Sequence, residues 1–284
     1  MKICLFTEEA AVCLSTEKGR SVKLQLSRQI RNFELMRRLK NLIGPARRRH
    51  FDDDFNWDTY TVDKYGPQQV RLDEEFDMRV DERVYFDKTS RKLVTGNAKL
   101  IPNSKTIYEI VGLLRVQSVL EIGCGGGDHI RNLKTLYPEI AVYGGDRSTE
   151  QLNFLASRNP EIAASTFVQD ITMPLSSKWP RVDLVYSQAV IMHIKTAVSH
   201  LNALANMLNL AAEYVVLVEN FGCHHFVDDI RKLHAGGHLN WENVHFYVHE
   251  YEGKPYGLIV ARKPCPLPPL QDYFSLPNAK KIRY

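Results

Sequence analysis

The sequence predicts an α/β fold whose sheet is mostly parallel and ends in an antiparallel hairpin. From about Ser104 onward, short apolar runs typical of buried strands alternate with segments long enough for helices. One of these runs leads directly into a glycine-rich turn, as a strand before a ligand-binding helix does. Near the end, two apolar runs are separated only by a short polar turn, so one strand of the sheet must run against its neighbours.

The expected elements follow one another in a regular order. A helix is expected over residues 104–114, with Ser104 as its N-terminal cap. Strands are expected at residues 118–122, 141–144, 165–168, 182–186 and 214–218, with helices such as 149–157 and 196–208 between them, and the hairpin strands at 245–249 and 256–260. Strands that alternate with helices in this way predict right-handed crossovers between parallel neighbours.

The chain divides into three parts by composition. Residues 1–100 hold a basic helix followed by an acidic and aromatic lid or connector, and residues 101–263 hold the α/β domain. Residues 264–284 form a proline-rich tail. Because proline cannot continue a helix or an inner strand, we expect the tail to be an extended surface strap.

The basic helix is expected over residues 23–43, where apolar residues recur every three or four positions with arginine and lysine between them. Residues 1–50 carry 12 Lys and Arg against 4 Asp and Glu, whereas the rest of the chain carries 25 against 29. We expect the helix to pack on its own domain or on another subunit of a homo-oligomer. The alternative is a peripheral contact with an anionic membrane or an acidic protein.

Composition excludes several classes of protein. No apolar stretch is long enough to span a bilayer, and Glu8 and Glu9 interrupt the start before a secretory segment forms, so a cytoplasmic location is expected. The five cysteines contain no Cys-x-x-Cys pair, which argues against a disulfide framework or a thiolate zinc site. Nucleic acid is not an expected partner, because the net charge is only +4 and the positive excess lies within residues 1–50.

The glycine-rich turn, Glu121-Ile122-Gly123-Cys124-Gly125-Gly126-Gly127-Asp128, is the most informative segment. Glycines there permit unusual torsions and let a ligand approach the backbone. A dinucleotide-binding fingerprint would need a glycine at position 128, where this sequence has Asp128. A carboxylate at the start of a helix also disfavours binding of a pyrophosphate. The two acids of the turn instead favour a ligand that carries positive charge.

The pattern Glu121-x-Gly123-x-Gly125-x-Gly127 resembles the first motif of the class I S-adenosylmethionine (SAM) dependent methyltransferases, small-molecule type. The resemblance implies a Rossmann-like seven-stranded fold and SAM as cofactor, with the ribose on Asp146 and the adenine amino group on Asp170. Residues 183–194 resemble the stretch that leads from the fourth strand to the reacting centre. The cofactor-binding residues that the resemblance implies are Glu121, Gly123, Cys124, Gly125, Gly127, Asp146, Arg147, Gln169, Asp170, Ile171, Ser187 and Gln188.

Methyl transfer needs an acceptor held near attack distance and, for a hydroxyl or ammonium acceptor, a base. His193 is the first candidate, because imidazole titrates near neutral pH and because it follows the fourth expected strand. Glu219 and His224, after the fifth, are further catalytic candidates. For His193 the alternative is a histidine that satisfies a backbone carbonyl.

A metal site is a weaker alternative. His224 and His225 precede Asp228 and Asp229, but adjacent residues seldom point at one ion, so no metal is expected. An aromatic wall that covers the sulfonium is a further hypothesis, with Trp57, Tyr60, Tyr65 and Tyr85 as its members.

The expected function is transfer of a methyl group from SAM to an oxygen or nitrogen of a small molecule, such as a saccharide or another envelope precursor. One alternative is an RNA methyltransferase, which is disfavoured by the net negative charge after residue 50 and by the lack of an Asn-Pro-Pro-Tyr motif. The other is a non-catalytic SAM-binding partner protein.

Overall fold

The computed structural model describes residues 79–281. Its elements, in chain order, are β1 (Tyr85–Asp87), β2 (Lys92–Val94), α4 (Pro102–Leu114), β3 (Ser118–Ile122), α5 (Asp128–Leu136), β4 (Ala141–Asp146), α6 (Thr149–Arg158), α7 (Pro160–Ala163), β5 (Thr166–Val168), β6 (Val182–Gln188), η1 (Ile191–His193), α8 (Ser199–Leu210), β7 (Ala211–Val218), α9 (Phe226–Ala235), β8 (His245–Tyr251), β9 (Lys254–Ala261), η2 (Tyr273–Ser275) and η3 (Ala279–Lys281). The helix expected at residues 23–43 and the aromatic residues Trp57, Tyr60 and Tyr65 lie outside the described residues.

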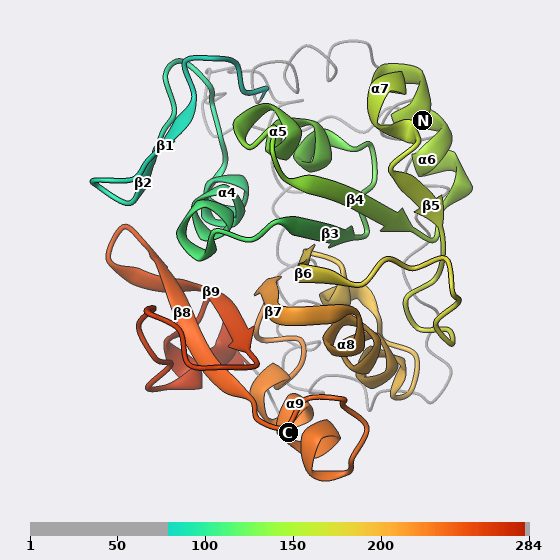
Figure 1. The fold of residues 1–284 in the computed structure, drawn as a ribbon. Coiled ribbons are helices and arrows are strands. Elements are labelled where there is room, and N and C mark those ends of the chain that lie inside the picture. Colours follow the sequence, from blue (N-terminus) through green and yellow to red (C-terminus); the bar gives the residue numbers. More distant parts are fainter. Residues whose placement is uncertain (1–78, 282–284) are drawn as a thin grey trace, which may run out of the picture. The chain divides into compact units, whose positions relative to one another are not determined.

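Seven strands form one mixed sheet in the order β5-β4-β3-β6-β7-β9-β8 (Figure 1). The pairs from β5 to β7 are parallel, and β9 is antiparallel to both β7 and β8. The predicted fold class, a mostly parallel seven-stranded sheet with a C-terminal antiparallel hairpin, is therefore confirmed. The strand order reverses between β3 and β6, and open α/β sheets bind their ligands at such a switch point.

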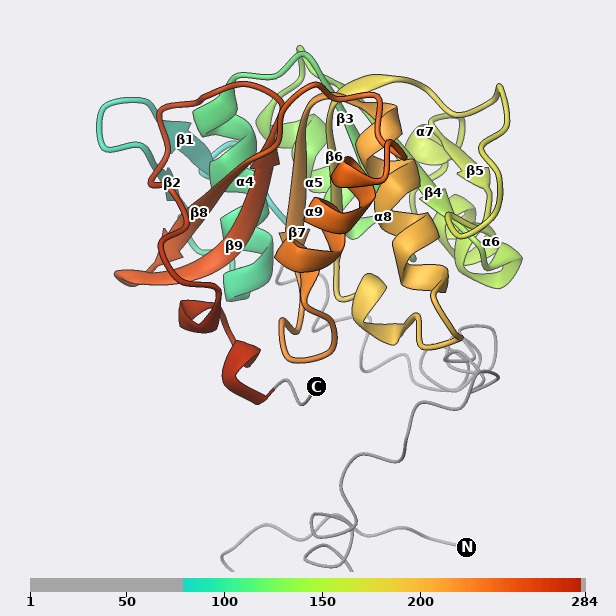
Figure 2. The ribbon, with the colours of Figure 1, turned by 90° about the horizontal axis from the view of Figure 1, so that it is seen from below.

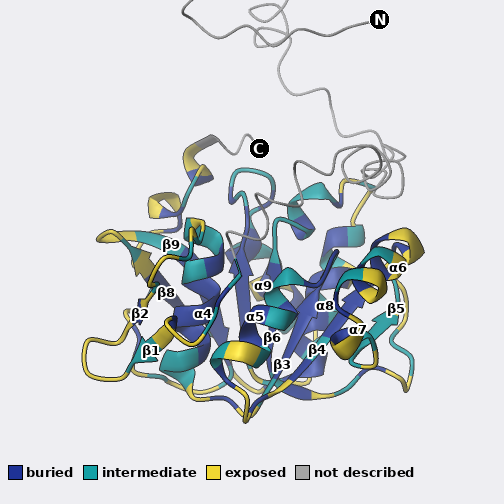
Figure 3. Cartoon of the chain, turned by 90° about the horizontal axis from the view of Figure 1, so that it is seen from above, coloured by how far each residue is buried: buried dark blue, intermediate teal, exposed yellow. Residues whose placement is uncertain are grey.

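Helices cover both faces of the sheet, and alternate strand residues point to the two sides. On one face, Leu120 of β3 packs with α8 and α9. On the other, Val119 packs with α4, α5 and α6. Figure 3 shows β3, β4 and β6 buried between the helices, as expected for parallel strands covered on both sides.

Helix α4 begins before Ser104, the residue predicted to be its cap. Ile101 is the N-cap residue, Pro102 occupies the first turn, and Ser104 is buried inside the helix. Proline fits the first helical position because the N–H group that it lacks would have no intrahelical partner there. The expected cap was therefore wrong by one turn.

The C-terminal segment is also more structured than an extended surface strap. It contains η2 and η3, and Tyr273, Leu276 and Ala279 are buried. The Tyr273 hydroxyl donates to the carbonyl oxygens of Phe221 and His224, at 2.9 and 2.6 Å. In Figure 2 the last described residues, in dark red, lie beside the loop that follows β7.

No helix within residues 79–281 has the length and apolar character needed to cross a bilayer.

Candidate functional site

A cavity of about 230 Å³ opens at the carboxyl ends of β3, β4 and β6, at the switch point of the sheet. Its lining includes nine residues of the expected cofactor and catalytic sets: Gly123, Gly125, Asp146, Arg147, Gln169, Asp170, Ile171, Gln188 and His193. Segments that lie about 70 residues apart in the sequence therefore meet at one edge of the sheet.

The glycine turn forms one wall of this cavity. The N–H groups of Gly123 and Cys124 donate to the Gly145 carbonyl oxygen, at 2.7 and 3.2 Å, which ties the turn to the end of β4. Gly123 and Gly125 have φ angles of 74° and 51°, which side chains rarely adopt. A Cβ on Gly123 would lie 2.4 Å from Val190 Cγ2, so glycine is required where the turn meets the loop after β6.

Other members of the motif lie behind the turn. Gly127 is the N-cap of α5 and packs against Leu155 of α6. Cys124 is buried beneath Gly144. Neither residue lines the cavity. Asp128 also lies outside the lining, and its carboxylate is paired with Arg158.

Glu121 is buried under the turn and is not part of the lining. Burial raises the pKa of this carboxyl well above its ordinary value, and the neighbouring Tyr186 hydroxyl opposes the shift. Placing the ionised form there without a partner is costly. A cationic group of a ligand, acting directly or through water, would offset that cost.

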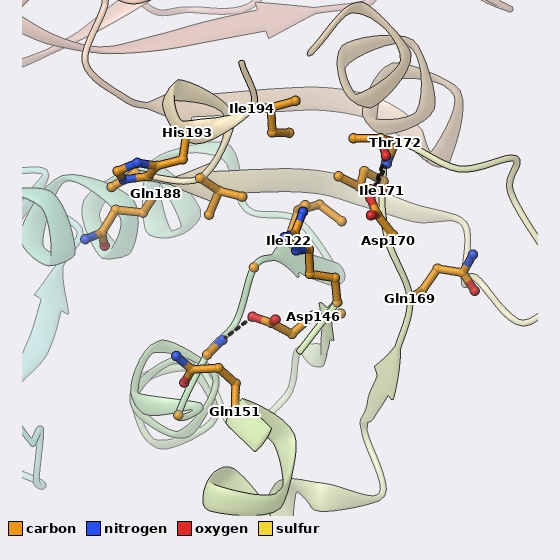
Figure 4. Close-up of a pocket in the computed structure, with 17 residues that line it drawn as sticks. Ile122, Asp146, Gln151, Gln169, Asp170, Ile171, Thr172, Gln188, His193 and Ile194 are labelled. Carbon is orange, nitrogen blue, oxygen red and sulfur yellow. Dashed lines mark hydrogen bonds between the residues drawn. The ribbon is translucent and has the colours of Figure 1, made fainter. Parts of the chain in front are cut away.

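Asp146 ends β4 and lies at the centre of the cavity (Figure 4). Its Oδ2 atom accepts a hydrogen bond from the Gly125 N–H at 2.9 Å, and Oδ1 accepts one from the Ser148 N–H at 2.8 Å. Burial raises the pKa of Asp146, while these two hydrogen bonds oppose the shift. Since each carboxylate oxygen has two lone pairs, both can still accept from ligand hydroxyls.

Asp170 follows β5 on another side of the cavity, with Ile171 and Thr172 (Figure 4). Its Oδ1 atom accepts from the Thr172 N–H and hydroxyl, at 2.8 and 2.7 Å, so the carboxylate caps a turn as well as facing the cavity. The Gln169 backbone N–H donates to the Asp146 carbonyl oxygen. Arg147 lines the cavity and is exposed.

Sequence reasoning missed Gln151, which lines the cavity from the first turn of α6. The signal was Ser148, which caps this helix by accepting from the Gln151 N–H and so directs the first turn toward the site. The Oε1 atom of Gln151 is buried and has no partner within the described part of the chain. The carboxylate oxygens of Asp146 and Asp170 supply acceptors along this lining, and a ligand with hydroxyl and amino groups fits it.

His193 ends η1 and lies on the same side of the cavity as Gln188 (Figure 4). Burial and the neighbouring Lys195 lower the pKa of His193 below its ordinary value. The imidazole is therefore neutral at neutral pH, which is the form that accepts a proton.

Glu219 lies behind this loop and binds it. Its Oε1 atom accepts from the Ser187 hydroxyl at 2.8 Å and from the N–H groups of Val190 and Ile191, and Oε2 accepts from the Met192 N–H at 3.2 Å. Glu219 and Ser187 are both outside the lining. These contacts favour a role for Glu219 in positioning the turn that carries His193.

His224 is also buried behind the turn. Its ring stacks on His200 with centroids 4.1 Å apart, and its Nε2 atom lies 3.1 Å from the Ile191 carbonyl oxygen. His225 instead stacks on Tyr273 and has Asp228 as its acidic neighbour, 3.3 Å away. The two histidines thus engage different partners. Within residues 79–281, no group of three or more His, Cys, Asp or Glu side chains is arranged to hold a metal ion.

Tyr85 does not form part of a wall over this cavity. It lies on β1, the residue is 54% exposed, and it is absent from the lining of the cavity. The hypothesis that Tyr85 covers the reacting sulfonium is therefore wrong.

Residues 119–213 match the family model of a methyltransferase domain. No curated protein sequence matches the chain. Among solved structures, magnesium protoporphyrin IX methyltransferase (ChlM) from Synechocystis PCC 6803 with bound SAM is 16% identical, covers 75% of this chain and 100% of its own, and has a TM-score of 0.43.

Two further solved structures are similar at the same level. The N-methyltransferase NodS from Bradyrhizobium japonicum WM9, in complex with S-adenosyl-L-homocysteine, is 17% identical, with 56% of this chain and 86% of its own covered and a TM-score of 0.38. A TehB-like SAM-dependent methyltransferase from Corynebacterium glutamicum is 17% identical, with 59% and 91% covered and a TM-score of 0.45.

Proposed function

We propose that this chain, whose residues 119–213 match the methyltransferase domain model, uses SAM to methylate an oxygen or nitrogen atom of a small molecule, such as a saccharide or another envelope precursor. The observation that carries this proposal is the cavity at the switch point, where Asp146, Gly123 and His193 line one space. The acceptors of this lining match the donor groups of SAM.

The cofactor would be held by residues from four segments. Asp146 accepts hydrogen bonds from the ribose hydroxyls, and Asp170 accepts one from the adenine amino group. The turn at Gly123 and Gly125 surrounds the methionyl part, with the Glu121 carboxylate beneath it. SAM supplies a methyl group on a positively charged sulfur, and its transfer forms a bond to the acceptor oxygen or nitrogen as the carbon–sulfur bond breaks and its electron pair stays on sulfur.

The chain itself contributes position and a base. His193 takes the proton of the acceptor hydroxyl or ammonium and passes it to solvent, because its lowered pKa keeps the ring neutral. Glu219 holds the N–H groups of residues 190–192 and so fixes where the ring of His193 lies. Ile122 and Ile194 contribute apolar surface to the same cavity.

The substrate class is tested by incubating the protein with methyl-labelled SAM and cell extract and then separating small molecules, RNA and protein. We expect label in the small-molecule fraction, and none in a control with boiled protein. Label in RNA would replace this proposal with the RNA alternative. Binding of SAM without transfer to any fraction would favour a non-catalytic partner protein.

Asp146→Ala should weaken SAM binding about 10- to 150-fold, the effect of removing hydrogen bonds to a charged group worth about 1.5–3 kcal/mol. Titration calorimetry measures it, and circular dichroism checks the fold. Asp87→Ala is the matched control, because its carboxylate also caps a turn but lines neither this cavity nor its neighbours. An unchanged SAM affinity in folded Asp146→Ala protein would remove Asp146 from the site.

A further inference from the structure

A second cavity, of about 200 Å³, adjoins the first one at Ala189. It lies beyond the carboxyl ends of β6 and β7, and Pro277 and Asn278 of the C-terminal segment form part of its lining. The Phe221 N–H donates to the Pro277 carbonyl oxygen at 3.3 Å, which joins the loop after β7 to that segment. The polar side chains of this second cavity are Asn103, Glu219, Asn220, Tyr256 and Asn278.

The turn after β6 separates the two cavities. Ala189 lines both, Val190 and His193 face the first, and Met192 faces the second. The Ala189 N–H donates to the Val218 carbonyl oxygen at 3.1 Å, so the turn is fixed to β7. A molecule in the second cavity would therefore lie next to the part of the cofactor cavity that holds the candidate base.

The second cavity is polar but offers little charge. No Lys or Arg is among its described lining residues. Glu219 is its one carboxylate, and both oxygens of that group already accept hydrogen bonds from Ser187 and the turn. A phosphate or carboxylate would find no cation here, and an amine would find at most the remaining lone pair of Glu219 Oε2.

Carboxamides and a phenol supply the hydrogen-bonding groups. The Tyr256 hydroxyl donates to Asn103 Oδ1 at 2.5 Å, and the Gly222 N–H donates to Asn220 Oδ1 at 3.0 Å. The amide nitrogens of Asn103 and Asn220 thus remain as donors without a partner in the described residues, and the Tyr256 oxygen remains an acceptor. Neutral donors and acceptors of this kind suit a molecule with several hydroxyl groups.

These polar residues lie outside residues 119–213, the part that matches the methyltransferase domain model. They come from α4, the loop after β7, β9 and the C-terminal segment. We infer that this cavity binds the methyl acceptor and selects an uncharged, polyhydroxylated molecule of the size of a sugar ring. The inference rests on the proposed function, because it assigns the second substrate of the same reaction.

Saturation-transfer NMR tests the inference on protein loaded with S-adenosylhomocysteine. The probes are methyl glycosides of glucose, galactose, mannose, rhamnose and fucose, with phenol and benzylamine as comparison molecules. We expect saturation of at least one glycoside and neither comparison molecule. Asn103→Ala, Tyr256→Phe and Asn278→Gly should each weaken its binding about 2- to 13-fold, as expected for the loss of one neutral hydrogen bond.

Asn153→Ala is the matched control, since Asn153 is exposed on α6 and lines neither cavity. Glycine is chosen to replace Asn278 because it tolerates the φ angle of 62° at this position. All four variants should bind S-adenosylhomocysteine as the wild type does. Absence of glycoside binding to wild-type protein that binds this cofactor product, or equal binding by the cavity variants, would overturn the inference alone. Failure of the wild type to bind the cofactor product would overturn the proposed function as well.

Discussion

His193→Ala should lower turnover about 10²- to 10⁴-fold and leave SAM affinity near the wild-type value, because a positioned general base contributes rate enhancements of this size. Burial and Lys195 lower the pKa of His193, so the acidic limb of the turnover–pH profile should have its midpoint below about 6.5, the ordinary histidine value. Activity should fall as pH drops through that midpoint, since the protonated ring cannot accept a proton. The variant should lack this limb.

His238→Ala is the matched control, because His238 is exposed and lines neither cavity. Turnover at saturating substrates, SAM affinity and melting temperature are measured for both variants. A histidine that only supports the turn after β6 would lower melting temperature and SAM affinity together. Near-normal turnover of His193→Ala would contradict the catalytic role and direct attention to Glu219, which lines the second cavity.

Gly123→Ala should abolish SAM binding, with a loss of affinity beyond 100-fold. The added Cβ would lie 2.4 Å from Val190 Cγ2, and the φ angle of 74° is strained for any side chain. The turn and the loop after β6 must then move apart, and both line the cofactor cavity.

Gly237→Ala is a control for the strain that a side chain adds at a positive φ angle outside the cofactor cavity. Gly237 has a φ angle of 71°, but a Cβ there would meet no atom within 4 Å. Both variants therefore carry the backbone strain, and only Gly123→Ala carries the collision. Circular dichroism establishes that each is folded, and calorimetry gives the SAM affinity. Wild-type affinity in folded Gly123→Ala protein would mean that the turn does not contact the cofactor.

The sequence predicted the sheet well because its strands are defined locally. Residues 118–122 form a short apolar run bounded by a turn and a glycine, and β3 occupies the same five residues. Asp146 and Asp170 could be assigned to one edge because the carboxyl ends of parallel strands meet there. Helix starts were harder, since Pro102 and Ser104 both carry signals for a helix start and only packing decides between them.

The roles of residues behind the cavity could not be predicted, because distant partners decide them. Glu219 has the sequence context of a reactive acid at a strand end, yet its carboxylate is engaged by Ser187 and the backbone of residues 190–192. The second cavity had no sequence signal. Asn103 and Asn278 are 175 positions apart, and only the tertiary fold brings them to one cavity.

The most direct test of the central claim, that the cavity at the switch point binds SAM, is a calorimetric titration of the wild-type protein with SAM and, in parallel, with NAD. We predict saturable binding of one SAM per chain and no heat with NAD, because the carboxylates of Asp146 and Asp170 line the cavity and disfavour a pyrophosphate. Binding of NAD without binding of SAM would contradict the account.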